Sequence, residues 1–365
     1  MKVIFSANTS WYLYNFRKTT IQRFVAEGHD VHIISPDDAY TDKLIALGVK
    51  KHDLFLSGNS LNPFLDTMTA IHLFILYLII RPGVIYNFTP KINIYSTFVC
   101  YLLPYVKVIN NIAGLGTAFI DDGYKKKLLQ ILYKLSQNRA DIVFFQNDED
   151  MAYFVNNKII KADKVRRILG SGVNLDAFIP SRMRKDTEVK FILVARLIEH
   201  KGVKLYAEAA RVIKDKYPHS SFALLGSIPE NNPASITPDE ISLWVENGFL
   251  DYLGHSDNVA EVLEQYDCVV LPSFYREGVP KSLLEAAACG KIIVTTNNIG
   301  CKDAVVDGET GFICEPKSQE SLIYALEKVL HLDSKDFVEM KINARKLAQD
   351  KFDEKLNIDK YLNTI

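Results

Sequence analysis

The sequence predicts an α/β protein of two doubly wound, Rossmann-like domains that face each other across a cleft, and three observations support this fold. A chain of 365 residues is too long for one compact sheet domain and suits two domains of about 150–200 residues. Short apolar runs alternate with helical patterns, which is typical of parallel sheets built from βαβ units. Residues 180–188, a polar stretch without periodicity, separate two such sets of runs and predict the linker.

The first half of the chain predicts a sheet covered by helices. We expect strands at residues 3–7, 30–35, 84–88, 106–110 and 142–146, and helices at residues 16–27, 65–80, 92–103 and 125–140. Gly28 follows the first of these helices, where a glycine commonly ends a helix. The most apolar run, residues 71–80, is shorter than the roughly 20 residues that a spanning helix needs. We therefore expect a buried crossover helix there and no membrane span.

The second half repeats the pattern. We expect strands at residues 189–194, 221–226, 250–254, 268–272 and 292–296. The predicted domains are residues 1–179 and residues 180–349, with the tail at about 350–365 packing back on the first domain. Because doubly wound domains bind ligands outside the carboxyl ends of their strands, the ligand site is expected in the cleft between the two.

Composition excludes several classes of function. Lys and Arg number 43 against 44 Asp and Glu, a net charge of -1 that gives no sign of a nucleic-acid partner. Neither G-x-G-x-x-G nor G-x-x-x-x-G-K-[ST] occurs, which argues against nicotinamide and P-loop chemistry. Five cysteines without a C-x-x-C pair predict reduced, buried thiols in a cytoplasmic protein, and no secretory signal opens the chain.

Neither a metal nor a cofactor is expected. Asp148-Glu149-Asp150 resembles a D-x-D metal motif, but it follows a predicted strand and opens an amphipathic segment. Acidic residues favour the first turn of a helix, so a helix start explains this triplet better. The eight histidines show no metal-ligand spacing with cysteines or acids.

The stretch at residues 271–290 carries the clearest chemistry, because it predicts a strand, a tight turn and a helix. Pro280 suits the first turn of that helix, and Gly290 suits its end. Unpaired backbone N–H groups at such a helix start bind phosphate, and a glycine in the turn lets a ligand approach the backbone. The residues predicted to bind the ligand there are Gly278, Val279, Pro280, Lys281 and Ser282.

Two carboxylates flank this helix start. Glu277 lies in the turn, beside the expected phosphate, and Glu285 lies in an otherwise apolar helical segment, where a carboxylate needs a specific partner. One carboxylate accepting sugar hydroxyls and a second accepting ribose hydroxyls fit a nucleotide sugar lying along the helix start.

The block at residues 277–285 resembles the Glu-x-seven-Glu signature of retaining family-4 glycosyltransferases, which have the GT-B fold. Blocks at residues 170–178, 194–202, 252–255 and 308–312 resemble other recurrent segments of that family, so the resemblance covers the whole chain. It implies that Arg196 and Lys201 grip the donor diphosphate and that Glu277 holds the donor hexose, which makes these three the catalytic residues. It further implies that Glu285 binds the ribose and that Gly226 and Ser227 lie near the nucleotide base.

Blocks at residues 15–17, 88–93 and 114–119 resemble the branch that assembles capsule, O-antigen and bacterial N-glycan units, including N-acetylgalactosaminyltransferases acting on undecaprenyl-diphosphate-linked glycans. The resemblance places five residues at the acceptor or in the cleft: Asn15, Arg17, Lys91, Gly114 and Gly116. This sequence departs from its relatives in two ways. Many relatives have a glycine-rich first loop, whereas residues 6–11 contain no glycine. Several relatives have a histidine facing the reacting sugar near the position of Pro90, whereas no histidine occurs there, so no catalytic histidine is assigned.

The resemblance implies a retaining transferase that moves a hexose or N-acetylhexosamine, with GalNAc or GlcNAc favoured, from a UDP-sugar to a polyprenyl-diphosphate-linked glycan. Within the family, the donor could instead be a UDP-hexose or a GDP-sugar. From other classes, a nucleotide-sugar 2-epimerase shares a two-domain cleft, and a non-catalytic sugar-binding module is a third interpretation. The complete set of donor-binding residues favours transfer.

The first domain carries a candidate membrane contact. Residues 124–135 combine a run of lysines with leucines at helical spacing, as an interfacial helix does. Such a helix would dock on an anionic membrane surface, where each Lys or Arg contributes about 1 kcal/mol. The alternative is that its leucines face the domain core and its lysines are solvated. The first interpretation predicts a peripheral protein on the inner face of the cytoplasmic membrane.

Overall fold

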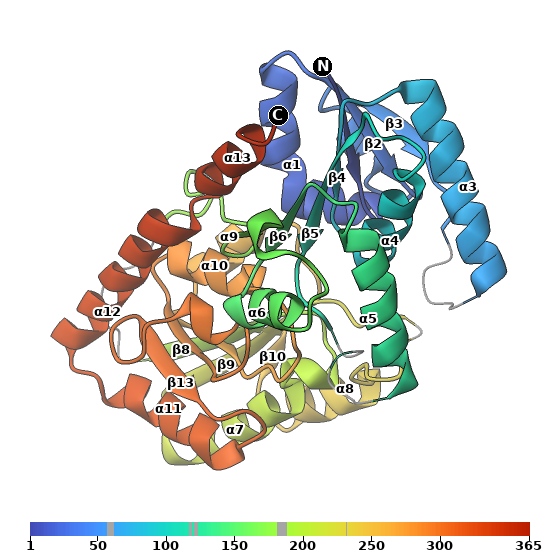
Figure 1. The fold of residues 1–365 in the computed structure, drawn as a ribbon. Coiled ribbons are helices and arrows are strands. Elements are labelled where there is room, and N and C mark those ends of the chain that lie inside the picture. Colours follow the sequence, from blue (N-terminus) through green and yellow to red (C-terminus); the bar gives the residue numbers. More distant parts are fainter. Residues whose placement is uncertain (57–61, 117–118, 120–122, 181–187, 231) are drawn as a thin grey trace. The chain divides into compact units, whose positions relative to one another are not determined.

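The computed structural model describes residues 1–365 except 57–61, 117–118, 120–122, 181–187 and 231 (Figure 1). The chain forms two compact units, which are described separately. Unit 1 comprises Met1–Ser171 and Asn357–Ile365, and unit 2 comprises Gly172–Leu356. The predicted linker lies almost wholly outside the described residues.

Unit 1 is built on a seven-stranded parallel sheet with strand order β3-β2-β1-β4-β5-β6-β7. The strands are β1 (Lys2–Ser6), β2 (Asp30–Ser35), β3 (Lys50–Asp53), β4 (Val84–Asn87), β5 (Lys107–Ile112), β6 (Ile142–Phe145) and β7 (Val165–Arg167). In the centre, Phe5 pairs with Ile33 on one side and Tyr86 on the other. The five predicted strands are present. The sequence did not reveal β3 and β7, because these edge strands are short and mostly polar.

Helices cover both faces of the unit 1 sheet. They are α1 (Ser10–Ala26), α2 (Thr41–Ile45), α3 (Pro63–Ile80), α4 (Pro90–Val99), α5 (Tyr124–Gln137), α6 (Asp148–Asn156) and the end of α13 (Glu354–Leu362), with the short 3-10 helix η2 (Ala162–Lys164). One core contains buried side chains of α3, α4, α5 and α6, such as Leu73 and Tyr133. A separate core contains those of α1, α2 and α13, such as Leu13 and Tyr361. Helices α3, α4 and α5 therefore share one face of the sheet.

The prediction of a buried crossover helix at residues 65–80 is wrong about burial. Helix α3 does cross from β3 to β4, but it has 18 residues and only 22% of it is buried. Its inward stripe is Thr69, Leu73, Tyr77 and Ile80. By length and composition, α3 is the one helix in the described part of the chain that could cross a membrane.

The end of the chain belongs to unit 1. Asn357 donates to the carbonyl of Gly170 at 3.3 Å, and Tyr86 Oη donates to the carbonyl of Tyr361 at 3.0 Å. The units divide at Ser171, eight residues before the predicted boundary. Residues 172–179 stay with unit 2 because Arg345 of α12 (Ser334–Leu347) donates to the carbonyl of Phe178 at 2.8 Å.

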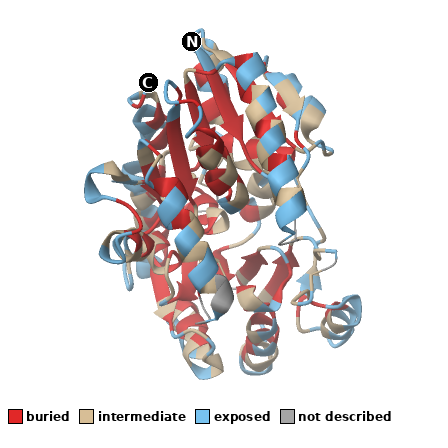
Figure 2. Ribbon diagram, turned by 45° about the vertical axis from the view of Figure 1, so that its right-hand side comes forward, coloured by how far each residue is buried: buried red, intermediate tan, exposed pale blue. Residues whose placement is uncertain are grey.

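Unit 2 is built on a six-stranded parallel sheet with strand order β10-β9-β8-β11-β12-β13. Its strands are β8 (Val189–Val194), β9 (Ser220–Leu225), β10 (Asp251–Tyr252), β11 (Cys268–Leu271), β12 (Ile292–Thr296) and β13 (Gly311–Cys314). Its helices, besides α12, are α7 (Val203–Lys216), α8 (Pro238–Glu246), α9 (Val259–Glu264), α10 (Lys281–Ala288) and α11 (Gln319–His331), with the short helices η3 (Glu199–Lys201), η4 (Lys302–Ala304) and η5 (Ala348–Phe352). The central strands of both sheets are buried, as the red strands of Figure 2 show.

The order of the strands in unit 2 locates a ligand site. From β8 the chain proceeds outward through β9 to β10, and it then returns to β11, on the other side of β8. Strand order therefore reverses between β8 and β11. Ligands of open α/β sheets bind at this point, outside the carboxyl ends of the strands.

Candidate functional site

The loops at the carboxyl edge of the unit 2 sheet interlock through glycines. Gly202, after η3, has a φ of +77°, and a Cβ there would run into the carbonyl of Pro272. Gly300, after β12, has a φ of +81°, and a Cβ there would run into the carbonyl of Gly278. Only glycine permits both the backbone conformation and the approach. The loop that follows β11 is thereby held between its two neighbours.

An ion pair lies in this interlocked region. Lys201 Nζ is 2.6 Å from Glu277 Oε1 and 2.5 Å from Oε2, with side chains that are 10% and 18% exposed. Ser273 Oγ donates to Glu277 Oε1 at 3.2 Å, and the ring of Tyr275 lies 5.7 Å from Lys201 Nζ. The pair is therefore largely buried, and Glu277 is the more exposed of the two side chains.

Hydrogen bonds hold the turn that carries Glu277. Asn298, beyond β12, donates to the carbonyl of Tyr275 at 2.8 Å, and Thr296 Oγ1 donates to the carbonyl of Ser273 at 2.5 Å. On the other side, the N–H of Phe274 donates to the carbonyl of His200 at 3.0 Å. Both flanking loops therefore fix the position of the carboxylate.

Arg196 follows β8, on the other side of the point where strand order reverses. It is exposed, and no hydrogen bond or ion pair joins its guanidinium to any residue that the structure describes. A planar guanidinium with five donors is suited to gripping a phosphate through two oxygens. Arg196 can therefore bind an anion at this edge without first breaking another pair.

Helix α10 begins at Lys281, four residues after Glu277. Pro280 occupies its N-cap, and no side chain caps the first turn. The first N–H groups of a helix have no intrahelical partner and lie at its positive end, so they attract an anion. Gly278 and Val279 are buried just before this start, whereas Ser282 is partly exposed on it.

Glu285 is one turn further along α10. Its side chain is 8% exposed and lies 3.5 Å from Lys281 Nζ. Burial raises the pKa of this carboxyl, and the neighbouring Lys281 offsets part of the rise. A buried carboxylate with one cation at that distance retains capacity to accept hydrogen bonds.

Gly226 and Ser227 lie at the same edge, after β9. The carbonyl of Ser227 accepts from the N–H of Leu197 at 2.9 Å, and Tyr252 Oη donates to the carbonyl of Gly226 at 3.0 Å. Gly226 packs against the carbonyl of Ala195, so the loops after β8 and β9 touch. The donor-site residues predicted in unit 2 thus all lie at one edge of one sheet.

The residues predicted in unit 1 are more dispersed. Lys91, in the first turn of α4, pairs with Asp66 of α3 at 3.1 Å, and Asn15 Nδ2 donates to the carbonyl of Trp11 within α1. Gly114 and Gly116 follow β5 with positive φ, and residues 117–118 of their predicted block lie outside the described residues.

Arg17, which the sequence places at the acceptor or in the cleft, is buried within unit 1. It is 1% exposed, with its guanidinium 4.6 Å from the ring of Phe88 and 5.8 Å from that of Tyr361. The reason is the returning C-terminal segment, which covers α1 on this side. Arg17 supports the packing of unit 1 through its contacts with these rings.

No group of three or more His, Cys, Asp and Glu side chains suited to a metal occurs in the part of the chain that the structure describes. The acidic triplet forms the first turn of α6, with Asn147 as its N-cap accepting from the N–H of Asp150, so the predicted helix start is confirmed. All five cysteines are free and buried, as predicted.

Two family models match the chain. Residues 2–147 match Glycosyl transferase 4-like, and residues 176–347 match Glycosyl transferases group 1. A Campylobacter jejuni protein named N,N'-diacetylbacillosaminyl-diphospho-undecaprenol alpha-1,3-N-acetylgalactosaminyltransferase is 32% identical, over 99% of this chain and 97% of its own length. The chain belongs to the group 1 glycosyltransferases.

Two further proteins are similar to this glycosyltransferase. An Escherichia coli protein named UDP-Gal:alpha-D-GlcNAc-diphosphoundecaprenol alpha-1,3-galactosyltransferase is 24% identical over 74% of this chain and 73% of its own length. The crystal structure of Anabaena HepE in complex with UDP superposes with a TM-score of 0.78 at 15% identity, covering 100% of this chain and 99% of the other. The glycosyltransferase has the predicted GT-B fold.

Sequence reasoning missed three residues that position Glu277 in this glycosyltransferase. They are Ser273, which bonds its carboxylate, Asn298, which bonds its turn, and Gly300, which packs against it. The Asn-Asn-Ile-Gly segment after the predicted strand at residues 292–296 was the available signal, because it is typical of a turn.

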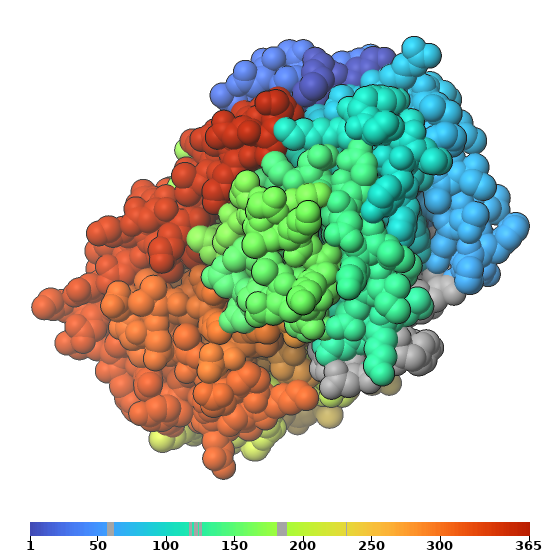
Figure 3. All heavy atoms as spheres, in the orientation of Figure 1, coloured from blue at the N-terminus to red at the C-terminus, as the bar shows by residue number. Residues whose placement is uncertain are grey.

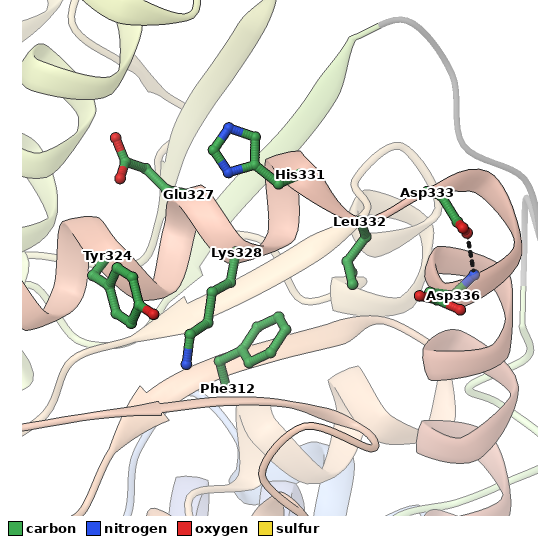
Figure 4. A pocket seen from close by; sticks show the side chains of 8 residues that line it. All are labelled: Phe312, Tyr324, Glu327, Lys328, His331, Leu332, Asp333 and Asp336. Atoms are coloured by element: carbon green, nitrogen blue, oxygen red, sulfur yellow. Dashed lines mark hydrogen bonds between the residues drawn. The ribbon is translucent and has the colours of Figure 1, made fainter.

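The glycosyltransferase also has a pocket of about 520 Å³ at α11 and α12 that contains none of the predicted residues (Figure 4). Lys328 Nζ lies 4.7 Å from the ring of Tyr324 and 5.3 Å from that of Phe312. The remaining lining residues are Glu327, His331, Leu332, Asp333 and Asp336. The loops that hold Glu277 and the ion pair of Lys201 and Glu277 do not line this pocket.

Proposed function

We propose that this glycosyltransferase is a retaining enzyme that transfers an N-acetylhexosamine, GalNAc or GlcNAc, from a UDP-sugar to a polyprenyl-diphosphate-linked glycan in surface polysaccharide or glycan assembly. The observation that carries the proposal is the largely buried pair of Lys201 and Glu277, which lies with Arg196 at the carboxyl edge of the unit 2 sheet. The full-length similarity to a transferase named for GalNAc and an undecaprenol diphosphate acceptor supports the choice of substrates.

The chemistry follows from the charges at this edge. Lys201 has three N–H donors, so it can bond Glu277 and a diphosphate oxygen at the same time. Arg196 and the start of α10 would neutralise the remaining negative charge as the nucleoside diphosphate leaves. Glu277 would accept hydrogen bonds from donor hydroxyls and thereby orient the anomeric carbon.

Retention needs no covalent intermediate in this arrangement. The bond between the anomeric carbon and the diphosphate oxygen breaks while the acceptor oxygen bonds to the same face of that carbon. The departing diphosphate oxygen takes the proton of the acceptor hydroxyl, so charges and atoms balance. We propose that no metal ion or cofactor takes part, because Arg196, Lys201 and the helix start supply the positive charge.

Unit 1 supplies a candidate contact for the membrane that holds such an acceptor. On α5, Leu128, Ile131 and Leu135 are 44%, 56% and 52% exposed, whereas Leu129 and Leu132 pack against the core. Part of the predicted apolar stripe therefore faces solvent beside exposed lysines, although the side chain of Lys125 lies outside the described residues. This arrangement supports a peripheral location on the inner face of the cytoplasmic membrane.

The test uses a panel of UDP-GalNAc, UDP-GlcNAc, UDP-Gal, UDP-Glc and a GDP-sugar with a short-chain polyprenyl-diphosphate-linked amino sugar. Mass spectrometry should show addition of one N-acetylhexosamine, and the NMR coupling of the new anomeric proton should match that of the donor. An inverted product would disprove retention. Conversion of the donor to its 2-epimer without acceptor would indicate an epimerase, and preference for another donor would revise the substrate.

A further inference from the structure

The outer side of α3 presents the largest run of exposed apolar side chains on any described helix. The residues that share this property are Phe64 (71% exposed), Met68 (44%), Ile71 (54%), Ile75 (47%), Leu78 (45%) and Ile79 (69%), named here the α3 stripe. Isolated exposed hydrophobic residues are common, but a contiguous row of six indicates a surface that binds something apolar. In Figure 3, α3 lies on the surface of unit 1 in light blue.

The stripe contains no charge. The one charged side chain of α3, Asp66, points away from it and pairs with Lys91 of α4 at 3.1 Å. Because the inward residues of α3 already pack on unit 1, the helix is apolar on both sides. A surface helix of a soluble protein normally turns a polar face toward water. The exposed apolar side of α3 is therefore expected to contact an apolar environment.

The stretch of chain that contains the stripe is basic. Among the described residues from 63 to 137, Asp66 is the only acidic side chain. Exposed cations on the same stretch are Arg81, Lys107, Lys127 and Lys134. The end of α4 adds Tyr101 and Tyr105, which are 51% and 60% exposed, and the hydroxyl of Tyr101 bonds the carbonyl of Leu135 on α5. Tyrosines and cations beside an apolar row are typical of the lipid–water interface.

We propose that α3 lies in the plane of an anionic lipid bilayer, with the α3 stripe among the acyl chains and the neighbouring cations at the headgroups. This inference rests on the peripheral location proposed above. It identifies α3, which the sequence predicts to be a buried helix, as the element that contacts the membrane. A second copy of the chain is the less favourable occupant, because two equally basic surfaces repel each other, whereas an anionic surface attracts one.

The fold excludes a spanning orientation. Strands β3 and β4, which precede and follow α3, belong to one sheet, and three residues separate Ile80 from β4. Lys2 Nζ donates to the carbonyl of Ile80 at 2.8 Å, which ties this end of the helix to β1. A spanning α3 would place its two ends on opposite sides of the bilayer, whereas the strands before and after it lie in the same sheet. The helix therefore lies in the interface.

The first experiment reports the environment of the stripe. Because all five native cysteines are buried, Ile75→Cys can be labelled with an environment-sensitive dye under native conditions. The matched control is Leu243→Cys on α8 of unit 2, where the native side chain is 57% exposed. Vesicles of phosphatidylglycerol and phosphatidylcholine should shift the dye emission to the blue at residue 75 and leave it unchanged at residue 243. Equal responses at both positions overturn the proposal.

The second experiment removes the apolar surface without adding charge. Ile71→Gln/Ile75→Gln/Ile79→Gln should reduce flotation with the same vesicles by at least about tenfold, because each buried apolar side chain adds to partitioning. The control Leu243→Gln/Tyr324→Gln/Ile342→Gln, at exposed positions of unit 2, should float like the wild type. High salt should weaken binding of the wild type only in part, since insertion is not screened. A triple variant of α3 that floats like the wild type overturns the proposal.

Two readouts separate this inference from its alternatives. Light scattering without vesicles should give a monomer for the wild type, and a dimer that the α3 variant abolishes would show that a second copy covers the stripe instead. Transfer to a water-soluble acceptor should proceed equally in the wild type and in the triple variant of α3. Normal transfer with undiminished flotation overturns this inference alone, whereas absent transfer in a protein that floats overturns the proposed function alone.

Discussion

The carboxyl edges of the two sheets carry different chemistry. In unit 1, the edge holds neutral side chains bonded to one another: Ser6 Oγ to Asn87 Oδ1 at 2.6 Å, Asn87 Nδ2 to Asn110 Oδ1 at 2.8 Å, and Asn110 Nδ2 to Gln137 Oε1 at 2.6 Å. All four are fully buried. In unit 2, the edge holds the paired ions Lys201 and Glu277, whose side chains are largely buried, with Arg196 nearby in sequence.

This difference indicates that the unit 1 edge serves stability, whereas the unit 2 edge suits ligand binding. A neutral network that satisfies its own donors and acceptors can be buried completely and rigidifies the strands that it joins. Charged groups pay a large desolvation penalty on burial, so a largely buried ion pair is weak evidence for stability and fits a site that receives a charged ligand. Substitutions at the two edges should therefore affect different measurements.

The largest effect is expected at Glu277. Glu277→Gln removes the negative charge beside Lys201 and weakens the acceptor of donor hydroxyls, so transfer should fall roughly 10–1000-fold. Thermal unfolding should change little, because the turn is held by other bonds. Glu246→Gln, at the exposed end of α8, is the control. A rate within about twofold of the wild type would remove Glu277 from the site.

At the other edge, Asn110→Ala should lower the free energy of unfolding by about 2–4 kcal/mol, because it leaves Asn87 and Gln137 with buried, unpaired amides. Donor affinity, measured by calorimetry, should stay at the wild-type value, since the substitution lies in unit 1. Loss of donor affinity with unchanged stability would break the comparison. Denaturant unfolding gives the stability.

A glycine at the unit 2 edge should combine both effects. Gly300→Ala places a Cβ against the carbonyls of Gly278 and Glu277 and should cost about 2–4 kcal/mol of stability, with reduced transfer because the turn shifts. Gly308→Ala is the matched control. Its φ of +77° is similar, but nothing lies within 4 Å, so only about 1 kcal/mol is expected. Equal losses for both variants would show that the loops are not interlocked.

A smaller effect is expected at Glu285. Burial raises the pKa of its carboxyl above the ordinary value of 4.5, so the folded protein holds this proton more tightly than the unfolded chain. The stability that the proton contributes is present below pH 4.5 and is lost as the pH rises through the folded-state pKa. Glu285→Gln should therefore raise the free energy of unfolding at pH 7, by less than the losses expected for the variants above. In unfolding measured across pH, a difference that grows toward pH 4.5 would contradict this sign.

The smallest effect is expected from chelation. If Arg196, Lys201 and the helix start neutralise the diphosphate, EDTA should leave donor affinity unchanged in thermal-shift and calorimetric titrations. A donor affinity that EDTA abolishes and magnesium or manganese restores would show that the positive charge at the unit 2 edge is incomplete without a metal.

The sequence by itself determined the parallel α/β architecture, most strands and the strand, turn and helix that contain the block at residues 277–285. These features are encoded locally. An apolar run such as residues 189–194 becomes a buried strand wherever its sheet forms, and Pro280 and Gly290 bound α10 because proline suits a helix start and glycine a helix end. Short polar edge strands such as β3 carry no such local pattern and were not predicted.

Only the tertiary structure decided which side chains meet and which stay exposed. Lys201 and Glu277 are 76 residues apart in the chain, so no local pattern predicts their ion pair. Arg17 is buried because the far end of the chain brings Tyr361 over it. The stripe of α3 is exposed although the helix is apolar, since periodicity shows which residues share a side and only packing shows whether anything covers that side.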